Sequence, residues 1–317
     1  TVNMIMEVLR KRNGVVGIFA EGQATWDGTT QAFIESTAKL VKLFKGSVIG
    51  VKIKGGYASR PRWSWNDRRG SIELEFFKLY EGPELKAKTP EEIYKEISLA
   101  LEHDDLAWIQ ETKRRYVSRK RAEHLELALF LCPSCGDDHS MRGSGGRLYC
   151  EACGAEWRVD SSYALSGSPE GIRGSFARQH AAFGTLLDRR IHDYSSRREA
   201  LIHDSVILLR GLRLKPFTRI GLGQAELHPD RISLVMETAS NRRFFKWLTD
   251  EKTYVFDFPL SELEGLSVLK QQYFEFYFEG AMWRFKFPER FQSGLRWLMA
   301  VEYCQKRDSE NSEGASK

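Results

Sequence analysis

Residues 132–136 read Cys-Pro-Ser-Cys-Gly, and residues 150–154 read Cys-Glu-Ala-Cys-Gly. Each C-x-x-C pair can place two thiolates on one side of a metal ion, and two pairs supply the four soft ligands of a tetrahedral zinc site. The glycine after each pair permits the positive φ that turns backbone N–H groups toward the sulfur atoms. We therefore predict a zinc ribbon over residues 128–165, with the ligands Cys132, Cys135, Cys150 and Cys153. A closed four-cysteine site leaves zinc no open position, so its expected role is folding; the alternative is a redox dithiol.

The rest of the composition is that of an ordinary globular protein. Hydrophobic residues make up 42% and charged residues 29% of the 317 residues, which predicts two or three domains. No run of about 18 apolar residues is present, so the sequence predicts no membrane-spanning helix, and its first dozen residues lack the pattern of a secretion signal. The fifth cysteine, Cys304, is expected to be a buried small hydrophobe.

The net charge of +5 suits an anionic partner such as a phosphate ester, a coenzyme, a nucleic acid or a lipid headgroup, and does not choose among them. The basic stretch 113–121 fits the same partners, although for each single residue a solvated helix face is the better explanation. A nucleic-acid partner is disfavoured, because aromatic and basic residues are not interleaved in the ribbon.

The part before the ribbon has the alternating pattern of an α/β fold. Short apolar runs predict buried strands at residues 15–19, 48–53 and 72–77, the first of them parallel. Residues 30–43 between the first two strands read as a helix. Thr89-Pro90-Glu91-Glu92 has the form of a capping box and predicts another helix start. A further helix is expected to carry the basic stretch and to continue to about residue 130.

The part after the ribbon is predicted to be rich in β-structure. Glycine, serine and proline at 166–174 indicate a linker, which we extend over 166–200. Short strands are expected within 201–306, followed by one helix from about residue 288, and the polar tail 307–317 is expected to be disordered. Strands closed by a single C-terminal helix suggest a small domain of the pleckstrin-homology type, by architectural analogy.

Residues 15–30 read V-V-G-I-F-A-E-G-Q-A-T-W-D-G-T-T. A strand that ends in Glu21-Gly22 would place a carboxylate at the carboxyl edge of a sheet, where ligands bind in open α/β folds. Further on, the chain reads Val-Ile-Gly-Val at 48–51, Gly-Gly-Tyr at 55–57, Ser-Arg-Pro-Arg-Trp at 59–63 and Arg-Arg-Gly at 68–70.

These stretches resemble the F-P-E-G-T-R-S motif and the following blocks of the glycerolipid acyltransferases, typified by 1-acyl-glycerol-3-phosphate acyltransferase. They are similar to a bacterial branch in which G-Y-x-x-x-P-R-W and R-R-G are followed by a T-P-E-E-I helix, a C-P-x-C-G ribbon and a β-rich domain. All of these features occur here in that order. The resemblance covers most of the chain and makes residues 1–127 the C-terminal part of an acyltransferase domain.

The resemblance implies acyl transfer from acyl-CoA or acyl carrier protein to a lysophospholipid in phospholipid biosynthesis. It also implies a cytoplasmic location at the membrane surface, with peripheral contact. Glu21 and Gly22 match the part of the motif that helps to hold the acceptor phosphate. The other expected acceptor-binding residues are Gln23, Thr25, Arg60 and Arg62, and for both arginines a solvated loop is the alternative explanation.

The sequence departs from the family pattern in two respects. Ala20, Ala24 and Gly50 replace a proline, an arginine and a second proline, and the lost arginine removes a bidentate phosphate donor. The family's catalytic base is the His of an H-x-x-x-x-D motif. None of the seven histidines has Asp five positions later, so no catalytic residue is assigned.

Two interpretations of that absence stay open. The first is an N-terminally truncated acyltransferase fragment. The second is a non-catalytic zinc-ribbon module that binds lipid, protein or nucleic acid.

Overall fold

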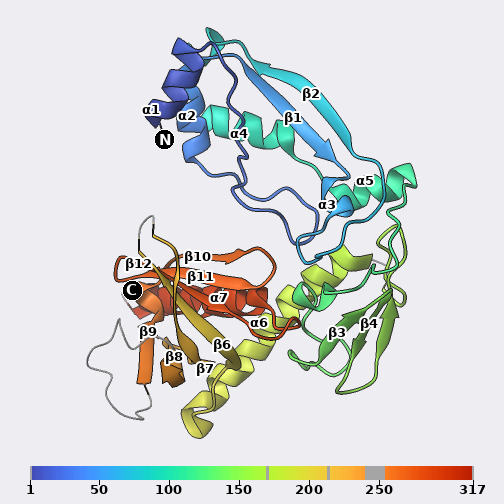
Figure 1. Cartoon of the computed structure of the whole chain (residues 1–317), viewed down its shortest axis with the longest axis vertical. Coiled ribbons are helices and arrows are strands. Elements are labelled where there is room, and N and C mark those ends of the chain that lie inside the picture. Colours follow the sequence, from blue (N-terminus) through green and yellow to red (C-terminus); the bar gives the residue numbers. More distant parts are fainter. Residues whose placement is uncertain (1, 169–170, 213–214, 240–253, 316–317) are drawn as a thin grey trace. The chain divides into compact units, whose positions relative to one another are not determined.

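The computed structural model describes residues 2–168, 171–212, 215–239 and 254–315 (Figure 1). The chain divides into two compact units. Unit 1 comprises Thr1–Arg119 together with Asp160–Tyr163, and unit 2 comprises Lys120–Val159 and Ala164–Lys317. The first segment of unit 1 therefore ends at Arg119. The sequence analysis placed the end of the acyltransferase-like part at residue 127.

Unit 1 combines helices with a two-stranded sheet. Its elements, in chain order, are α1 (Val2–Met6), a π-helical turn (Glu7–Lys11), α2 (Ser36–Phe44), β1 (Val48–Lys54), α3 (Gly56–Ser59), β2 (Glu73–Tyr80), a 3-10 turn (Glu84–Lys86), α4 (Pro90–Leu101) and α5 (Asp105–Thr112). A core of Phe33, Ala38, Tyr80, Leu85, Ile93 and Ile97 joins α2, α4 and one face of the sheet.

The two later strands of unit 1 are confirmed as strands, but the prediction that they are buried is wrong, because alternate residues from Ile49 to Ile53 and from Leu74 to Phe76 are 40–65% exposed. Their arrangement also differs from the expected one. β1 and β2 pair antiparallel, with Val51 opposite Phe76 and Gly50 opposite Phe77. A Cβ on Gly50 would lie 2.5 Å from the Phe77 ring, so the glycine leaves the space that this ring occupies. That packing gives a physical reason for glycine at a position where the resembled family has proline.

The predicted strand at residues 15–19 is wrong. These residues form no regular structure, and Val15 and Phe19 are 93% and 84% exposed. An apolar run becomes a strand only when a neighbouring strand pairs with it. Within the described part of unit 1, β1 and β2 pair with each other and neither pairs with this run. The helix expected from residue 30 begins later, at Ser36.

The two predicted helices after β2 differ in outcome. The capping box is confirmed, because Thr89 Oγ1 accepts from Glu92 N at 3.2 Å and Glu92 Oε2 accepts from Thr89 N at 2.8 Å. The helix expected through the basic stretch is wrong. α5 ends at Thr112, because Lys113 adopts the left-handed conformation at φ 54° and stops the helix.

Unit 2 begins with a 3-10 turn (Leu125–Leu127) and the ribbon strands β3 (Met141–Ser144), β4 (Arg147–Cys150) and β5 (Glu156–Arg158). The helix α6 (Gly171–Arg197) follows. The remaining elements are β6 (Ile202–Gly211), β7 (Thr218–Leu227), β8 (Arg231–Ala239), β9 (Tyr254–Pro259), a 3-10 turn (Leu260–Glu262), β10 (Glu264–Leu269), β11 (Tyr273–Phe278), β12 (Ala281–Lys286) and α7 (Gly294–Ala315).

The β-rich part is one seven-stranded antiparallel sheet in the order β10-β11-β12-β6-β7-β8-β9. Alternate side chains of its strands point into an aromatic core that includes Phe258, Phe274, Phe276 and Phe285. Trp297 of α7 closes this core, with its ring centroid 5.6 Å from that of Phe285. The fold is therefore a mixed α/β arrangement with a large β-sheet, as predicted at that level.

The expected linker 166–200 is wrong, because α6 occupies most of it (Figure 1). Glycine and serine cluster only near its start, while Ile172, Gln179, Phe183 and Leu187 recur at helical spacing and are buried. The expected disordered tail is also wrong up to Ala315, where α7 ends. Lys306 and Glu310, one turn apart, pair at 3.7 Å and support the helix there.

No helix among the described residues is both long enough and apolar enough to cross a membrane.

Candidate functional site

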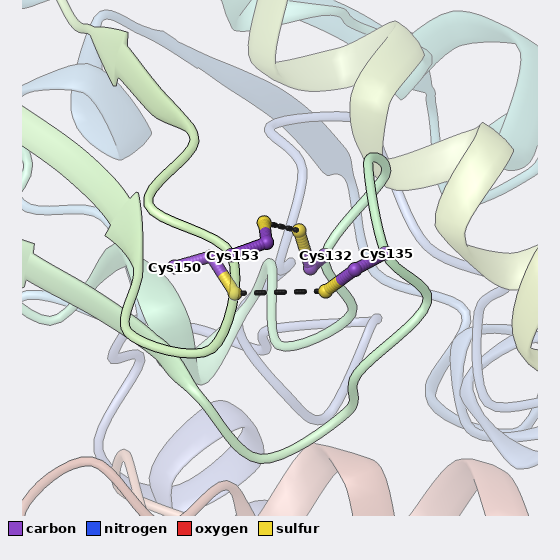
Figure 2. Close-up of side chains that lie close together, drawn as sticks. All are labelled: Cys132, Cys135, Cys150 and Cys153. Atoms are coloured by element: carbon purple, nitrogen blue, oxygen red, sulfur yellow. Dashed lines mark hydrogen bonds between the residues drawn. The ribbon is translucent and has the colours of Figure 1, made fainter.

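The four predicted cysteines lie together in the ribbon of unit 2 (Figure 2). Their sulfur atoms are all within 4.8 Å of one another. Cys132 Sγ lies 3.7 Å from Cys153 Sγ, and Cys135 Sγ lies 3.8 Å from Cys150 Sγ, so each close pair joins one C-x-x-C turn to the other. Four sulfurs at about 2.3 Å from a central ion form a tetrahedron with edges of about 3.8 Å. A disulfide needs about 2.05 Å, so these distances fit four ligands of one metal ion.

Local backbone geometry builds this site from the sequence. Gly136 N donates to Cys132 O, and Gly154 N donates to Cys150 O, both at 2.9 Å. The two glycines have φ of 77° and 75°, and a Cβ on either would meet nothing within 4 Å. Their role is therefore conformational freedom, as the sequence predicted, and not the avoidance of a clash.

The electrostatic environment differs between the two buried thiols and the two exposed thiols. Cys132 and Cys150 are buried, whereas Cys135 and Cys153 are exposed. Burial raises the pKa of Cys132 to about 12 and also raises the pKa of Cys150, while a hydrogen bond from the backbone of Ala155 lowers the pKa of Cys153. A bound cation would offset the cost of ionising the two buried thiols.

Asp138, three residues after the first C-x-x-C turn, attaches the ribbon to α6. Arg190 donates to both of its carboxylate oxygens at 2.9 Å, and the same guanidinium donates to Leu201 O at 2.7 Å. Asp138 is only 7% exposed. Burial alone would raise the pKa of Asp138, but the hydrogen bond from Arg190 and the charges of Arg296 and Arg190 lower it below its usual value.

Arg296 of α7 makes a second attachment between the ribbon and the sheet. It donates to Asp138 O at 2.8 Å, to His203 O at 3.0 Å and to Asp204 Oδ2 at 2.6 Å. Trp297 Nε1 donates to the same Asp204 oxygen at 2.8 Å. Since Arg296 and Asp204 are both buried, the ribbon and the seven-stranded sheet share one hydrogen-bonded network.

A cavity at this junction, lined in part by Glu126, Asp138, Asp204 and Arg296, has a volume of about 10 Å³. That volume holds at most one water molecule. The junction is therefore a packing interface within unit 2, and it does not offer room for a substrate.

Four of the residues predicted to bind an acceptor gather in one part of unit 1. Glu21 Oε2 accepts from Gln31 N at 2.8 Å, and Gln31 Nε2 donates to Thr25 Oγ1 at 3.2 Å. Arg62, far along the chain, donates to Gln23 Oε1 at 2.9 Å and to Ala24 O at 2.5 Å. Its guanidinium lies 4.6 Å from the ring centroid of Trp26. These contacts form two sets on the loop that precedes α2: Gln31 bonds to Glu21 and Thr25, and Arg62 bonds to Gln23 and Ala24.

The other two predicted residues lie in different settings. Gly22 has φ 70°, a conformation that glycine adopts without strain, so the backbone gives one reason for glycine at this position. Arg60 is exposed and pairs with Asp67 at 3.4 Å, which matches the solvated-loop alternative.

Glu21 does not end a buried strand, because residues 15–19 form none. Partial burial nevertheless raises the pKa of Glu21.

Sequence reasoning missed a histidine–carboxylate pair in unit 1. His103 Nε2 lies 2.8 Å from Asp105 Oδ1, and Asp105 is 2% exposed. The same carboxylate accepts from Gly55 N at 2.6 Å and Ala58 N at 3.2 Å, so it ties the start of α5 to α3. The signal was the run His-Asp-Asp at 103–105, where an acidic pair shortly after an amphipathic helix marks the start of the next helix.

Comparison with known proteins adds no family to this description. The sequence matches no protein-family model, and no curated protein sequence matches it either.

Proposed function

We propose that unit 1 is the acceptor-binding part of an acyltransferase of phospholipid biosynthesis, with a lysophospholipid as acceptor and an acyl thioester of coenzyme A or acyl carrier protein as donor. The observation that supports this most is the cluster of Glu21, Gln23, Thr25 and Arg62. These residues were expected to bind an acceptor from the resemblance. Glu21, Gln23 and Thr25 are neighbours on one loop, Gln31 bonds to Glu21 and Thr25, and Arg62 is hydrogen-bonded to Gln23.

The chemistry of the cluster suits a phosphate ester that carries a hydroxyl group. Burial lowers the pKa of Arg62 to about 10, so its guanidinium is still charged at neutral pH but has lost much of its hydration. A phosphate group can accept charge-assisted hydrogen bonds from such a guanidinium. Glu21 can accept a hydrogen bond from the acceptor hydroxyl, because its carboxylate is half-buried and fixed by Gln31 N.

We propose that the metal ion of the ribbon is zinc and that its role is structural. Four thiolates with no open coordination position exclude a bound catalytic water, which is the arrangement of structural zinc sites. The ion would thus stabilise the ribbon and, through Asp138, its attachment to α6.

We propose that the seven-stranded sheet with α7 is a domain of the pleckstrin-homology type. The order of its strands supports this, because β6 to β9 and β10 to β12 each form a run of sequential antiparallel neighbours that α7 follows. We further propose that the whole protein lies on the cytoplasmic face of the membrane and contacts it through exposed cations of the basic stretch in unit 1, namely Lys113, Arg115 and Arg119.

Binding of sn-glycerol 3-phosphate tests the acceptor site without interference from micelles. Trp26 lies beneath Arg62 and gives a fluorescence signal, which phosphorus NMR can check independently. We expect saturable binding that weakens roughly thirtyfold or more in Arg62→Gln and in Glu21→Gln, since each loses a charged contact worth about 2–4 kcal/mol.

The matched control is Arg60→Gln, which changes an exposed arginine of the same loop and should leave binding within about twofold. Equal melting temperatures for the variants show that the fold is retained. No saturable binding by the unmodified chain, or equal binding by all variants, rejects the acceptor site. In that case the non-catalytic binding module is the function to pursue.

A further inference from the structure

Tyr57, in α3, joins the loop that carries the proposed acceptor site to the interior of unit 1. Its hydroxyl donates to Trp26 O at 2.9 Å and accepts from Trp63 Nε1 at 3.0 Å. Trp63 is fully buried, and Trp26 is 7% exposed. One hydroxyl group therefore links the backbone of the loop at residue 26 to a buried side chain that lies outside the loop.

The ring of Tyr57 holds the same loop at a second point. Gly28 has φ 90°, and a Cβ at this position would lie only 3.0 Å from Tyr57 Cδ1. The backbone at Gly28 therefore passes directly against the ring, at a distance that leaves little room for a side chain. The loop is thus held at residue 26 by the hydroxyl of Tyr57 and at residue 28 by its ring.

Tyr57 can hold the loop because α3 is itself fixed. Asp105, which is 2% exposed, accepts from Gly55 N at 2.6 Å and from Ala58 N at 3.2 Å, on either side of Tyr57 in the sequence. Hydrogen bonds to an ionised carboxylate are shorter and stronger than those between neutral groups. Asp105 N also donates to Gly28 O at 3.0 Å. The same buried residue therefore fixes both the short helix and the loop that Tyr57 contacts.

Trp26 connects this frame to the cation that we assign to the acceptor phosphate. The guanidinium of Arg62 lies over the Trp26 ring, 4.6 Å from its centroid. Arg62 also donates to Ala24 O and Gln23 Oε1 of the same loop. Because a planar guanidinium stacks on an aromatic face, the plane of the ring restricts the direction of its N–H groups. A binding group must be held within about 0.5 Å of its productive position, so a shift of Trp26 would weaken the site.

We propose that Tyr57 is a positioning residue of the acceptor site. Its hydroxyl fixes Trp26, and Trp26 in turn fixes the direction in which Arg62 presents its guanidinium to a phosphate ester. Tyr57 acts on the ligand only through these two residues. This role rests on the acceptor site proposed above, and it identifies the side chain that keeps the site in shape before a ligand binds.

Tyr57→Phe removes the hydroxyl, keeps the ring and so tests the proposal in the full chain. Titration with sn-glycerol 3-phosphate, followed by phosphorus NMR, should give a dissociation constant raised about five- to tenfold, the effect of about one hydrogen bond. The matched control is Tyr116→Phe, because Tyr116 is fully buried and its hydroxyl also donates to a backbone oxygen, Ser71 O at 2.5 Å. The control should lose similar stability in thermal unfolding but keep its dissociation constant within about twofold.

A second background separates positioning of Arg62 from a general loosening of unit 1. Arg62→Lys keeps the positive charge but loses the planar group that stacks on Trp26. In this background, adding Tyr57→Phe should change the dissociation constant by less than about twofold, because no guanidinium is left for the hydroxyl to position. An equal loss from Tyr57→Phe in both backgrounds overturns the proposal. So does an equal weakening of binding in Tyr116→Phe.

Binding by the unmodified chain separates the role of Tyr57 from the acceptor site itself. If the unmodified chain binds sn-glycerol 3-phosphate and Tyr57→Phe binds it equally well, the acceptor site stands and the positioning role of Tyr57 is rejected. If the unmodified chain shows no saturable binding, the acceptor site is rejected and the role of Tyr57 is rejected with it.

Discussion

Replacing Asp138 by Asn probes how firmly the ribbon is held by the rest of unit 2. The substitution keeps the size of the side chain but removes its charge. It also turns one acceptor oxygen into an NH₂ donor that faces the guanidinium of Arg190, which currently donates to both oxygens at 2.9 Å. Arg296, which approaches the same carboxylate at 3.6 Å, loses part of its charge compensation.

The expected loss of unfolding free energy follows from burial. Removing one partner of a buried ion pair costs about 3–5 kcal/mol. The cost should be smaller here, because 31% of the Arg190 side chain remains exposed and Arg296 keeps Asp204 as a partner. We expect about 2–3 kcal/mol, which lowers the melting temperature of a unit of this size by about 4–12 °C.

The stability lost in Asp138→Asn should decrease as the pH falls. The pKa of Asp138 is lower in the folded state than in the unfolded chain, so its charge stabilises the fold above the unfolded value of about 4. This stabilisation is lost as the pH falls from there toward the folded pKa. The difference between the unmodified chain and Asp138→Asn should therefore shrink below about pH 4.

Urea unfolding followed by the fluorescence of buried Trp297 measures the effect, since this tryptophan belongs to the shared network. The control is Asp230→Asn, which breaks an exposed pair with Arg231 and should change stability by less than about 0.5 kcal/mol. If the two variants lose the same stability, or if the loss in Asp138→Asn persists at low pH, the reasoning about the buried network is refuted.

Three further predictions concern the metal, the chemistry and a helix start. Elemental analysis should find about one zinc per chain, and Cys135→Ser should lose it while unit 1 keeps its melting transition; four freely titratable thiols without zinc would contradict this. The chain alone should show no acyl transfer to lysophosphatidic acid, because it contains no H-x-x-x-x-D base; turnover at the rate of a complete acyltransferase would be the opposite result. Thr89→Ala should destabilise unit 1 by about 1 kcal/mol in urea unfolding through loss of the capping box, whereas an unchanged midpoint would show that the cap contributes nothing.

Features that depend on neighbours in the sequence could be predicted. The capping box at Thr89 and the glycine turns after Cys135 and Cys153 are formed by residues within four positions of one another. Their geometry follows from local backbone chemistry, so the sequence is sufficient. The meeting of the two C-x-x-C turns was also predictable, because a four-ligand site requires both.

Features that depend on distant partners could not be predicted in the same way. The run at 15–19 has the composition of a strand, but composition does not reveal whether a second strand pairs with it. Asp138 contacts Arg190 and Arg296, which lie 52 and 158 positions away in the sequence, and no local pattern marks these charges as partners. The gathering of Arg62 with Gln23 was expected only from the resemblance, and no periodicity in the sequence indicates it.

The return of residues 160–163 to unit 1 has a consequence for dividing the protein experimentally. Tyr116 N donates to Ser161 O at 2.7 Å, and the Tyr163 hydroxyl donates to Ala58 O. The backbone therefore passes between the two units three times, so no single cleavage separates them into intact halves. A recombinant fragment that stops at Arg119 would leave the buried Tyr116 without its neighbour Tyr163 and would expose apolar surface. Unit 1 is better produced by deleting the ribbon and joining residue 119 to residue 160 with a short glycine–serine linker.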